Sequence, residues 1–303
     1  MNISEKFNPK ANVVLFNGDC LKILEKIPDN FVKLVVTSPP YNIGKSYEKR
    51  EKLDKYLASQ RKVIQECVRV LSPNGSICWQ VGNYVDNGEI IPLDILLYPI
   101  FNELNLKMRN RIVWHFGHGL HASKRYSGRY EVILWFTKTD VYTFNLDAVR
   151  VPSKYPNKRH FKGPKKGELS GNPLGKNPSD VWDIPNVKSN HIEKTIHPAQ
   201  FPIELIERLV LSLTDEDDWT LDPFMGVGTT QIASIIHSRK SIGAEILPEY
   251  YKVAKERINL AVEGELLIRP MERPVFDPNT KEKYVPPKRV NVGNNSTSLF
   301  PNY

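Results

Sequence analysis

Apolar residues occur in two patterns along the chain, and these patterns alternate near both of its ends. Continuous, β-branched runs at 13–18 and 32–37 predict buried strands, because the strands of a parallel sheet are covered on both faces. From 53 to 71 the apolar residues recur at helical spacing, and the turn sequence SPNG at 72–75 is expected to end this helix. The same reasoning predicts a short helix opening at Asp19, a strand at 76–82, a helix at 89–104, and a strand pair at 111–116 and 130–136.

Regular patterns fade from about 138 to 196, where Pro, Gly, Asn and Lys dominate, and then return. The returning elements are a helix at 201–213, a strand at 219–222, a helix at 229–237, a strand at 241–245 and a helix at 248–262. Strands that alternate with helices predict an α/β fold with a doubly wound, mostly parallel sheet. We expect one domain built from two halves, 1–137 and 197–268, with an irregular insertion at 138–196 and an irregular basic tail at 269–303.

Composition narrows the class of protein. With 303 residues, 40% of them hydrophobic, the chain can bury a sizeable core, and its formal net charge of +8 favours a polyanionic partner. No apolar run approaches the ~18 residues of a membrane span, and the N-terminus lacks the apolar core of a signal peptide. Cys20, Cys67 and Cys78 are widely spaced, which argues against disulfides and structural zinc. We expect a soluble, cytoplasmic protein without a metal.

A glycine-containing loop is expected after the strand at 219–222. Asp222 ends that strand in the sequence LDPFMGVGTT, and Gly226 and Gly228 would let a ligand approach the backbone closely. Ligands of open α/β sheets bind at the carboxyl ends of the strands. Glu245, about twenty residues further on, ends the next strand, where an acidic side chain suits the two hydroxyls of a ribose. The loop therefore favours a bound adenosine, although a plain tight turn would also contain such glycines.

The sharper signal is Ser38-Pro39-Pro40-Tyr41, which directly follows the strand at 32–37. Two consecutive prolines fix the backbone and remove two N–H donors, so the Ser38 hydroxyl and a proline carbonyl are left as acceptors at the end of the strand. The Tyr41 ring adds a flat surface for stacking. Acceptors beside an aromatic ring suit a flipped-out base that carries an amino group. The alternative is a proline-rich turn that merely ends a strand.

Such a corner could activate an amine without a metal. An exocyclic amine is a poor nucleophile, because its lone pair is delocalised into the ring. Hydrogen bonds from its N–H groups to Ser38 and to the Pro39 carbonyl would favour a pyramidal nitrogen with its lone pair aimed at a methyl donor. Catalysis of this kind depends on positioning and electrostatics.

Taken together, these segments resemble the amino-methyltransferases that modify DNA in restriction systems, in the permuted motif order called the β group. The matching segments are NGDCLKIL at 17–24, TSPPY at 37–41, LSPNGSICWQVGN, RYSGRYEVILWFTK, HPAQFPIELIERLV at 197–210 and LDPFMGVGTT at 221–230. The resemblance covers roughly 13–137 and 197–262. It implies the circularly permuted fold of S-adenosylmethionine-dependent methyltransferases, with a catalytic half, a target-recognition insertion at 138–196 and a cofactor-binding half.

The resemblance also implies roles for single residues. Ser38, Pro39, Pro40 and Tyr41 would form the catalytic segment. Asp19, with Cys20 beside it, would contact the adenine of S-adenosylmethionine, and Glu245 would hold its ribose. The residues expected around the methionine portion are Asp222, Phe224, Gly226, Gly228, Thr229 and Thr230, and those expected to support the pocket from the neighbouring helix are His197, Pro198 and Phe201.

The base to be modified is suggested by the residue before PPY. In the family that this chain resembles, serine at that place usually accompanies methylation of cytosine N4, and an acidic or amide residue usually accompanies adenine N6. Ser38 therefore favours N4 of cytosine, and HPAQFP in place of HPTQKP leans the same way. N6 of adenine stays open, because some adenine enzymes carry SPPY. More distant alternatives are an RNA or protein-glutamine amino-methyltransferase and a catalytically silent nucleic-acid-binding module.

Two basic stretches are the predicted contacts to double-stranded DNA. Residues 150–176 contain eight Lys or Arg and one acidic residue, and residues 107–129 contain six and none. The first stretch falls where the family places target recognition, and phosphate contacts from it would make DNA affinity sensitive to salt. The side chains singled out are Lys124, Arg125, Arg129, Lys154, Lys158, Arg159, Lys162, Lys165 and Lys166. The alternative is a set of ordinary solvated lysines.

The remaining expectations concern metals and partners. His115, His118 and His121 have no carboxylate or cysteine close in sequence, so we expect no metal site there. A separately encoded restriction endonuclease fits the family as a partner, and the chain could act as a monomer or a homodimer.

Overall fold

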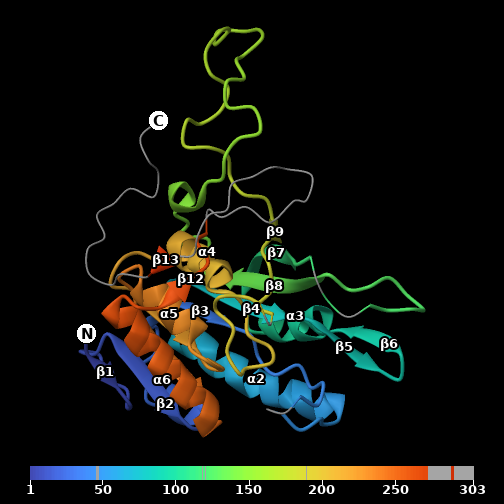
Figure 1. The fold of residues 1–303 in the computed structure, drawn as a ribbon, viewed down its shortest axis with the longest axis vertical. Helices are drawn as coiled ribbons and strands as arrows, with labels where there is room; N and C mark the ends of the chain where they lie inside the picture. Colours follow the sequence, from blue (N-terminus) through green and yellow to red (C-terminus); the bar gives the residue numbers. More distant parts are fainter. Residues whose placement is uncertain (46–47, 118, 120, 189, 272–287, 290–303) are drawn as a thin grey trace.

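A nine-stranded sheet forms the centre of the molecule, with the strand order β1-β2-β11-β10-β3-β4-β8-β7-β9 (Figure 1). The structure is a computed structural model and describes residues 1–45, 48–117, 119, 121–188, 190–271 and 288–289. The strands are β1 Ile3–Ser4, β2 Val13–Asn17, β3 Val32–Thr37, β4 Leu71–Val81, β7 Lys107–His115, β8 Tyr130–Thr137, β9 Val181–Asp183, β10 Trp219–Asp222 and β11 Lys240–Glu245. Neighbours run parallel except at β8, which is antiparallel to β4 and β7. The mostly parallel sheet expected from the sequence is confirmed.

Helices cover both faces of this sheet. One layer contains α1 Cys20–Leu24, α2 Leu53–Val70 and α3 Leu93–Glu103, and the other contains α4 Ile203–Leu213, α5 Thr229–Ile235 and α6 Pro248–Glu263. Alternate residues of β3 point to opposite faces of the sheet: Val35 packs in the hydrophobic core of one layer, and Leu34 and Val36 pack in that of the other. Since both faces are covered, β3 is buried along its whole length, which explains why its sequence is mostly apolar. Among the described helices none is long and apolar enough to cross a membrane.

The order of the strands brings distant parts of the chain together. β10 lies directly beside β3, with Thr220 opposite Leu34, although β3 precedes it in the sequence by most of the chain. Strands β2, β3, β4, β10 and β11 all end at one edge of the sheet, which we call the carboxyl edge. β8 runs the other way, so its first residues, Tyr130 and Glu131, also lie at this edge.

Three predicted boundaries are wrong, and one of them is the start of β7, which lies at Lys107 and not at residue 111. The SPNG sequence is not a turn that separates helix from strand: it forms a bulge inside β4, because Val32 pairs with Leu71 and Leu34 already pairs with Ser76. The helix expected from residue 89 begins only at Leu93.

A hairpin takes the place of the first turn of that predicted helix. It consists of β5 Asn83–Asp86 and β6 Glu89–Pro92. Asn87 and Gly88 connect the two strands with φ values of 46° and 86°. An Asn-Gly pair with two positive φ angles makes the tight turn whose twist matches that of the flanking strands.

The insertion contains two elements that the sequence did not predict. These are the 3-10 helix η1 Leu146–Val149 and strand β9, which extends the sheet beside β7. Between them, residues 150–176 project from the body of the molecule (Figure 1), with isolated β-bridges joining Val151 to Lys176 and Arg159 to Leu169. The irregular tail expected from residue 269 falls mostly outside the described residues. Within it, β13 Lys288–Arg289 pairs with β12 Leu267–Ile268.

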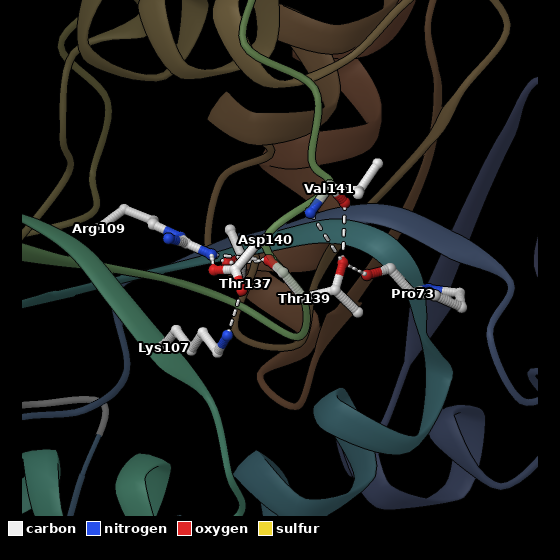
Figure 2. Close-up of polar contacts among 7 residues, drawn as sticks. All are labelled: Pro73, Lys107, Arg109, Thr137, Thr139, Asp140 and Val141. Carbon is white, nitrogen blue, oxygen red and sulfur yellow. Dashed lines mark hydrogen bonds and ion pairs between the residues drawn. The ribbon is translucent and has the colours of Figure 1, made fainter.

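Polar contacts fix the turn after β8 at the edge opposite the carboxyl edge (Figure 2). Asp140 accepts a hydrogen bond from Arg109 Nη2 at 2.8 Å and pairs with Lys107. The Thr139 hydroxyl donates to the Pro73 carbonyl at 3.0 Å. These contacts tie β7 and β8 to the bulge of β4, so the β8 strand is held at both of its ends.

Candidate active site

A cleft of about 490 Å³ opens at the carboxyl edge. This volume lies in the range of small-molecule sites, roughly 300–1,000 Å³. Of the residues singled out in the sequence, those that line it are Asp19, Cys20, Ser38, Pro39, Pro40, Tyr41, His197, Phe201, Phe224, Gly226, Thr229 and Glu245. The SPPY segment and the glycine loop therefore share one cleft, because the strands that precede them are neighbours in the sheet.

Asp222 fixes the glycine loop from below. Its side chain is fully buried, and Oδ1 accepts hydrogen bonds from the Thr37 hydroxyl and from Phe224 N, the latter at 3.0 Å. Oδ2 accepts from the Thr230 hydroxyl at 2.7 Å. Burial raises the pKa of Asp222 to about 6, although these hydrogen bonds oppose the shift. Because Thr37 ends β3, this carboxylate joins the loop directly to the strand that carries the SPPY segment.

Four of the residues predicted to contact the cofactor do not line the cleft: Pro198, Asp222, Gly228 and Thr230. Asp222 and Thr230 lie beneath the loop. Gly228 faces α6, where an added Cβ would stand 3.1 Å from the Cβ of Ala254. The geometry thus gives these three residues a place in shaping the loop, and not at the wall of the cleft.

Glu245 stands at the end of β11, in the wall of the cleft. Its Oε2 accepts a hydrogen bond from Gly226 N at 3.0 Å, and its Oε1 accepts one from Leu247 N at 2.8 Å. Desolvation raises the pKa of Glu245 to about 7. Each carboxylate oxygen can accept two hydrogen bonds, so Glu245 keeps acceptor capacity for a hydroxyl in the cleft.

Two further residues frame the cleft. Asp19 caps α1, with its Oδ1 accepting from Leu21 N at 2.9 Å. The His197 ring packs edge-on against Tyr250, with ring centroids 4.5 Å apart. Desolvation lowers the pKa of His197 to about 4, so the ring is neutral at neutral pH. A Cβ at Gly226 would lie 3.4 Å from His197 Nε2 and would narrow the cleft, which is why glycine at 226 leaves room for a ligand.

The SPPY corner is held by a chain of hydrogen bonds. Ser38 Oγ donates to Tyr41 Oη at 3.2 Å, and Tyr41 Oη donates to Glu131 Oε2 at 3.1 Å. Gln80 Nε2 donates to the same oxygen of Glu131. Sequence reasoning missed Gln80 and Glu131. The one available signal was an acidic residue at the start of the apolar run YEVILWF, and only the antiparallel course of β8 brings it to the carboxyl edge.

The side chains selected from the two basic stretches lie in different parts of the structure. Lys124 and Arg125 are exposed in the connection between β7 and β8, at the carboxyl edge, and Arg129 is partly buried there. The stretch at 150–176 begins near the C-terminal end of α4, where Asn145 N donates to the Ser212 carbonyl at 2.7 Å. Its six selected side chains are all exposed: Lys154, Lys158, Arg159, Lys162, Lys165 and Lys166.

The histidines and cysteines have ordinary surroundings. His115 Nδ1 contacts the Asp183 carboxylate, and His118 lies outside the described residues. Within the described ranges, no group of three or more His, Cys, Asp or Glu is placed to hold a metal ion. Cys20, Cys67 and Cys78 are buried free thiols.

The fold and the cleft define a class of protein, an α/β protein with a doubly wound sheet and a ligand-sized cleft at the carboxyl ends of its strands. The sequence model of the N6/N4 DNA methylase family matches residues 32–256, and the chain belongs to this family. It is therefore a DNA methyltransferase, and the resemblance seen in its motifs is confirmed.

Two curated relatives illustrate the range of the family. The chain is 57% identical over 241 residues to the type II methyltransferase M.BglII of Bacillus subtilis, in an alignment that covers 79% of this chain and 67% of that protein. It is 35% identical over 261 residues to the DNA adenine methyltransferase YhdJ of Escherichia coli K12, in an alignment that covers 84% of this chain and 85% of that protein.

Solved structures share the fold. The cytosine-N4-specific PvuII DNA methyltransferase matches with a TM-score of 0.66 at 23% identity, over 81% of this chain and 86% of that one. A DNA modification methylase from Thermus thermophilus, solved with S-adenosyl-L-methionine, matches with a TM-score of 0.56 at 30% identity, over 80% of this chain and 93% of that one.

Proposed function

We propose that the protein transfers a methyl group from S-adenosylmethionine to the exocyclic amino nitrogen, N4, of a cytosine flipped out of duplex DNA. The observation that carries this proposal is the cleft itself, whose wall contains both the glycine loop and the SPPY corner. A methyl donor held by the loop and an amine held by the corner would meet in one space. Membership of the DNA methylase family supports the donor, the acceptor and the class of reaction.

The residues of the loop fit the donor. S-adenosylmethionine supplies an activated methyl group on a sulfonium. Glu245 would accept hydrogen bonds from the ribose hydroxyls, and Asp19 would bind the adenine from the end of α1. Gly226 leaves the room that the donor needs beside His197, whose neutral ring adds no charge repulsion to a cationic ligand. Asp222 and Thr230 hold this surface from below.

The SPPY corner fits the acceptor. Ser38 Oγ and the Pro39 carbonyl would accept the two N–H groups of the amine, and the Tyr41 ring would stack on the base. These contacts favour a pyramidal nitrogen and direct its lone pair toward the glycine loop, so the rate is raised mainly by positioning. The amine loses a proton to solvent after the transfer.

Two observations bear on the base. Ser38 before PPY favours cytosine N4 by the pattern of the family, whereas the Escherichia coli relative is an adenine methyltransferase. The likeness to the PvuII enzyme is too low in identity to choose between them and supports the fold alone. N6 of adenine is therefore the second candidate.

Analysis of the product tests the proposal. Duplex DNA of mixed sequence would be methylated in vitro, digested to nucleosides and measured by mass spectrometry. We expect N4-methylcytosine; N6-methyladenine would transfer the proposal to the second candidate, and the absence of both would end it. An RNA duplex of matched sequence is the control and should remain unmodified.

The wider setting is proposed from the same family. The type II relative supports a role in a restriction-modification system, with a separately encoded endonuclease that cleaves the same unmethylated site. The basic stretches would supply the phosphate contacts to DNA.

A further inference from the structure

The catalytic corner contacts a carboxylate that methyl transfer by Ser38 and Tyr41 alone does not require. Glu131 is the second residue of β8 and lies beside the end of β4 at the carboxyl edge. Its Oε2 accepts hydrogen bonds from Tyr41 Oη at 3.1 Å and from Gln80 Nε2. Tyr41 lines the cleft, whereas Glu131 and Gln80 do not. Glu131 is therefore placed to influence the reacting base through Tyr41.

The direction of the hydrogen bonds follows from what each group can donate. An ionised carboxylate only accepts, so Tyr41 gives its single hydroxyl hydrogen to Glu131. Toward Ser38, Tyr41 can then only accept, and Ser38 Oγ donates to it at 3.2 Å. With its hydrogen engaged by Tyr41, Ser38 keeps its lone pairs for a donor in the cleft.

Close packing holds the Tyr41–Glu131 contact in place. Gly82, which follows β4, lies against both partners: an added Cβ would stand 2.9 Å from Tyr41 Cε2 and 3.3 Å from Glu131 Oε1. A side chain at 82 would displace one of the two. Gly82 is thus the residue that lets the phenol and the carboxylate meet.

We propose that Glu131 is a positioning residue of the methyl transfer: through Tyr41 it holds the Ser38 hydroxyl hydrogen away from the cleft, so that Ser38 Oγ accepts an N–H of the target amine. This inference rests on the proposed function. With an amide in place of the carboxylate, an N–H group can face Tyr41, whose hydrogen is then free to turn toward Ser38. Ser38 would then turn its own hydrogen into the cleft, where it opposes the N–H of the amine.

The first test replaces the carboxylate with an amide of the same size. Glu131→Gln should lower kcat roughly 10- to 100-fold, less than the loss of a group that contacts the reacting atoms directly, because Glu131 acts through Tyr41. The Kd for S-adenosylmethionine and the melting temperature should stay at the wild-type values, because Glu131 lies outside the donor pocket. Asp140→Asn, beyond the other end of β8, is the matched control and should keep full kcat.

A double-mutant cycle then tests the route through Tyr41. Tyr41→Phe removes the hydroxyl, so adding Glu131→Gln to it should cause no further loss of kcat. Independent, multiplicative losses would overturn the proposal, as would wild-type kcat in Glu131→Gln or in Tyr41→Phe. In each of those cases the wild-type protein still methylates DNA, so the proposed function is not affected. Failure of the wild-type protein to methylate any DNA would instead remove the proposed function and this inference together.

Discussion

At the scale of single residues, burial raises the pKa of three carboxyl groups in the cleft or beside it. Asp222, Glu245 and Glu131 are all carboxyl groups whose pKa is raised by desolvation, and each is held by at least two hydrogen bonds from the protein. The hydrogen bonds keep the carboxylates in fixed orientations, while burial brings their protonation closer to neutral pH.

Glu245 makes donor binding depend on pH in a defined direction. Its pKa in the free protein is about 7, raised from the ordinary value by burial. Ribose hydroxyls donate to the ionised form, so affinity should increase as pH rises through 7 and then level off. We predict a Kd for S-adenosylmethionine about tenfold weaker at pH 6 than at pH 8, measured by calorimetry.

Glu245→Gln provides the control for that measurement. The amide does not titrate, so the variant should bind more weakly at pH 8 and show little change above pH 6.5. Any change in affinity that the variant shows below pH 6.5 is expected from Asp222, whose pKa is about 6. A variant that keeps the full pH dependence would show that another group is responsible.

At the scale of elements, two glycines have similar positive φ angles but differ in the space around them. Comparing them separates the cost of backbone strain from the cost of a steric clash. Gly228, at the start of α5, has φ 78°, and Gly88, in the β5–β6 turn, has φ 86°. A Cβ at Gly88 would meet open space, whereas a Cβ at Gly228 would lie 3.1 Å from Ala254 in α6.

We predict that the two alanine variants differ in stability. Gly88→Ala should lower the free energy of unfolding by about 1 kcal/mol through backbone strain alone. Gly228→Ala should lower it by about 2–4 kcal/mol, because overpacking between α5 and α6 adds to the same strain. Urea denaturation measures both values. Equal losses would mean that α6 moves aside without cost.

At the scale of the whole molecule, the basic stretches extend in different directions from the sheet. The β7–β8 connection stands at the carboxyl edge, beside the cleft, and the 150–176 stretch projects from the region where α4 ends (Figure 1). Exposed aromatic residues accompany the lysines of the second stretch, with Phe161 91% exposed.

Salt dependence distinguishes phosphate contacts from solvated lysines. Replacing Lys165 and Lys166 with Ala should reduce the slope of log affinity against log salt by about 1.8, that is, about 0.9 for each lost contact. Lys124→Ala with Arg125→Ala should have a similar effect. Replacing Lys6 and Lys10, two exposed lysines at the β1 end of the sheet, should leave the slope unchanged. An unaltered slope in either test pair would assign that pair to the solvated surface.

Local patterns in the chain were enough to predict most of the helices and strands and the two segments that meet in the cleft, the SPPY segment and the glycine loop. Strand β3 was predicted at its observed bounds, because a strand covered on both faces is mostly apolar, here except for Lys33 and Thr37, and this is visible locally. Helix α2 was predicted to within one residue of its observed end, because its apolar residues recur at helical spacing. The glycine loop was also located from its local sequence. The β5–β6 hairpin was missed, although its Asn87-Gly88 turn is a local signal, because the apolar residues after it also suited a helix.

Which residues meet was settled by the folded arrangement alone. Asp222 was expected around the methionine portion of the cofactor, but its hydrogen bond with Thr37 was not foreseen, because it depends on β10 lying beside β3. Glu131 was not singled out, because its contact with Tyr41 depends on β8 running antiparallel to β4. Local periodicity specifies a strand or a helix, since neighbouring residues share it. The partners of a side chain across a sheet depend on strand order and direction, which arise from the packing of the whole chain.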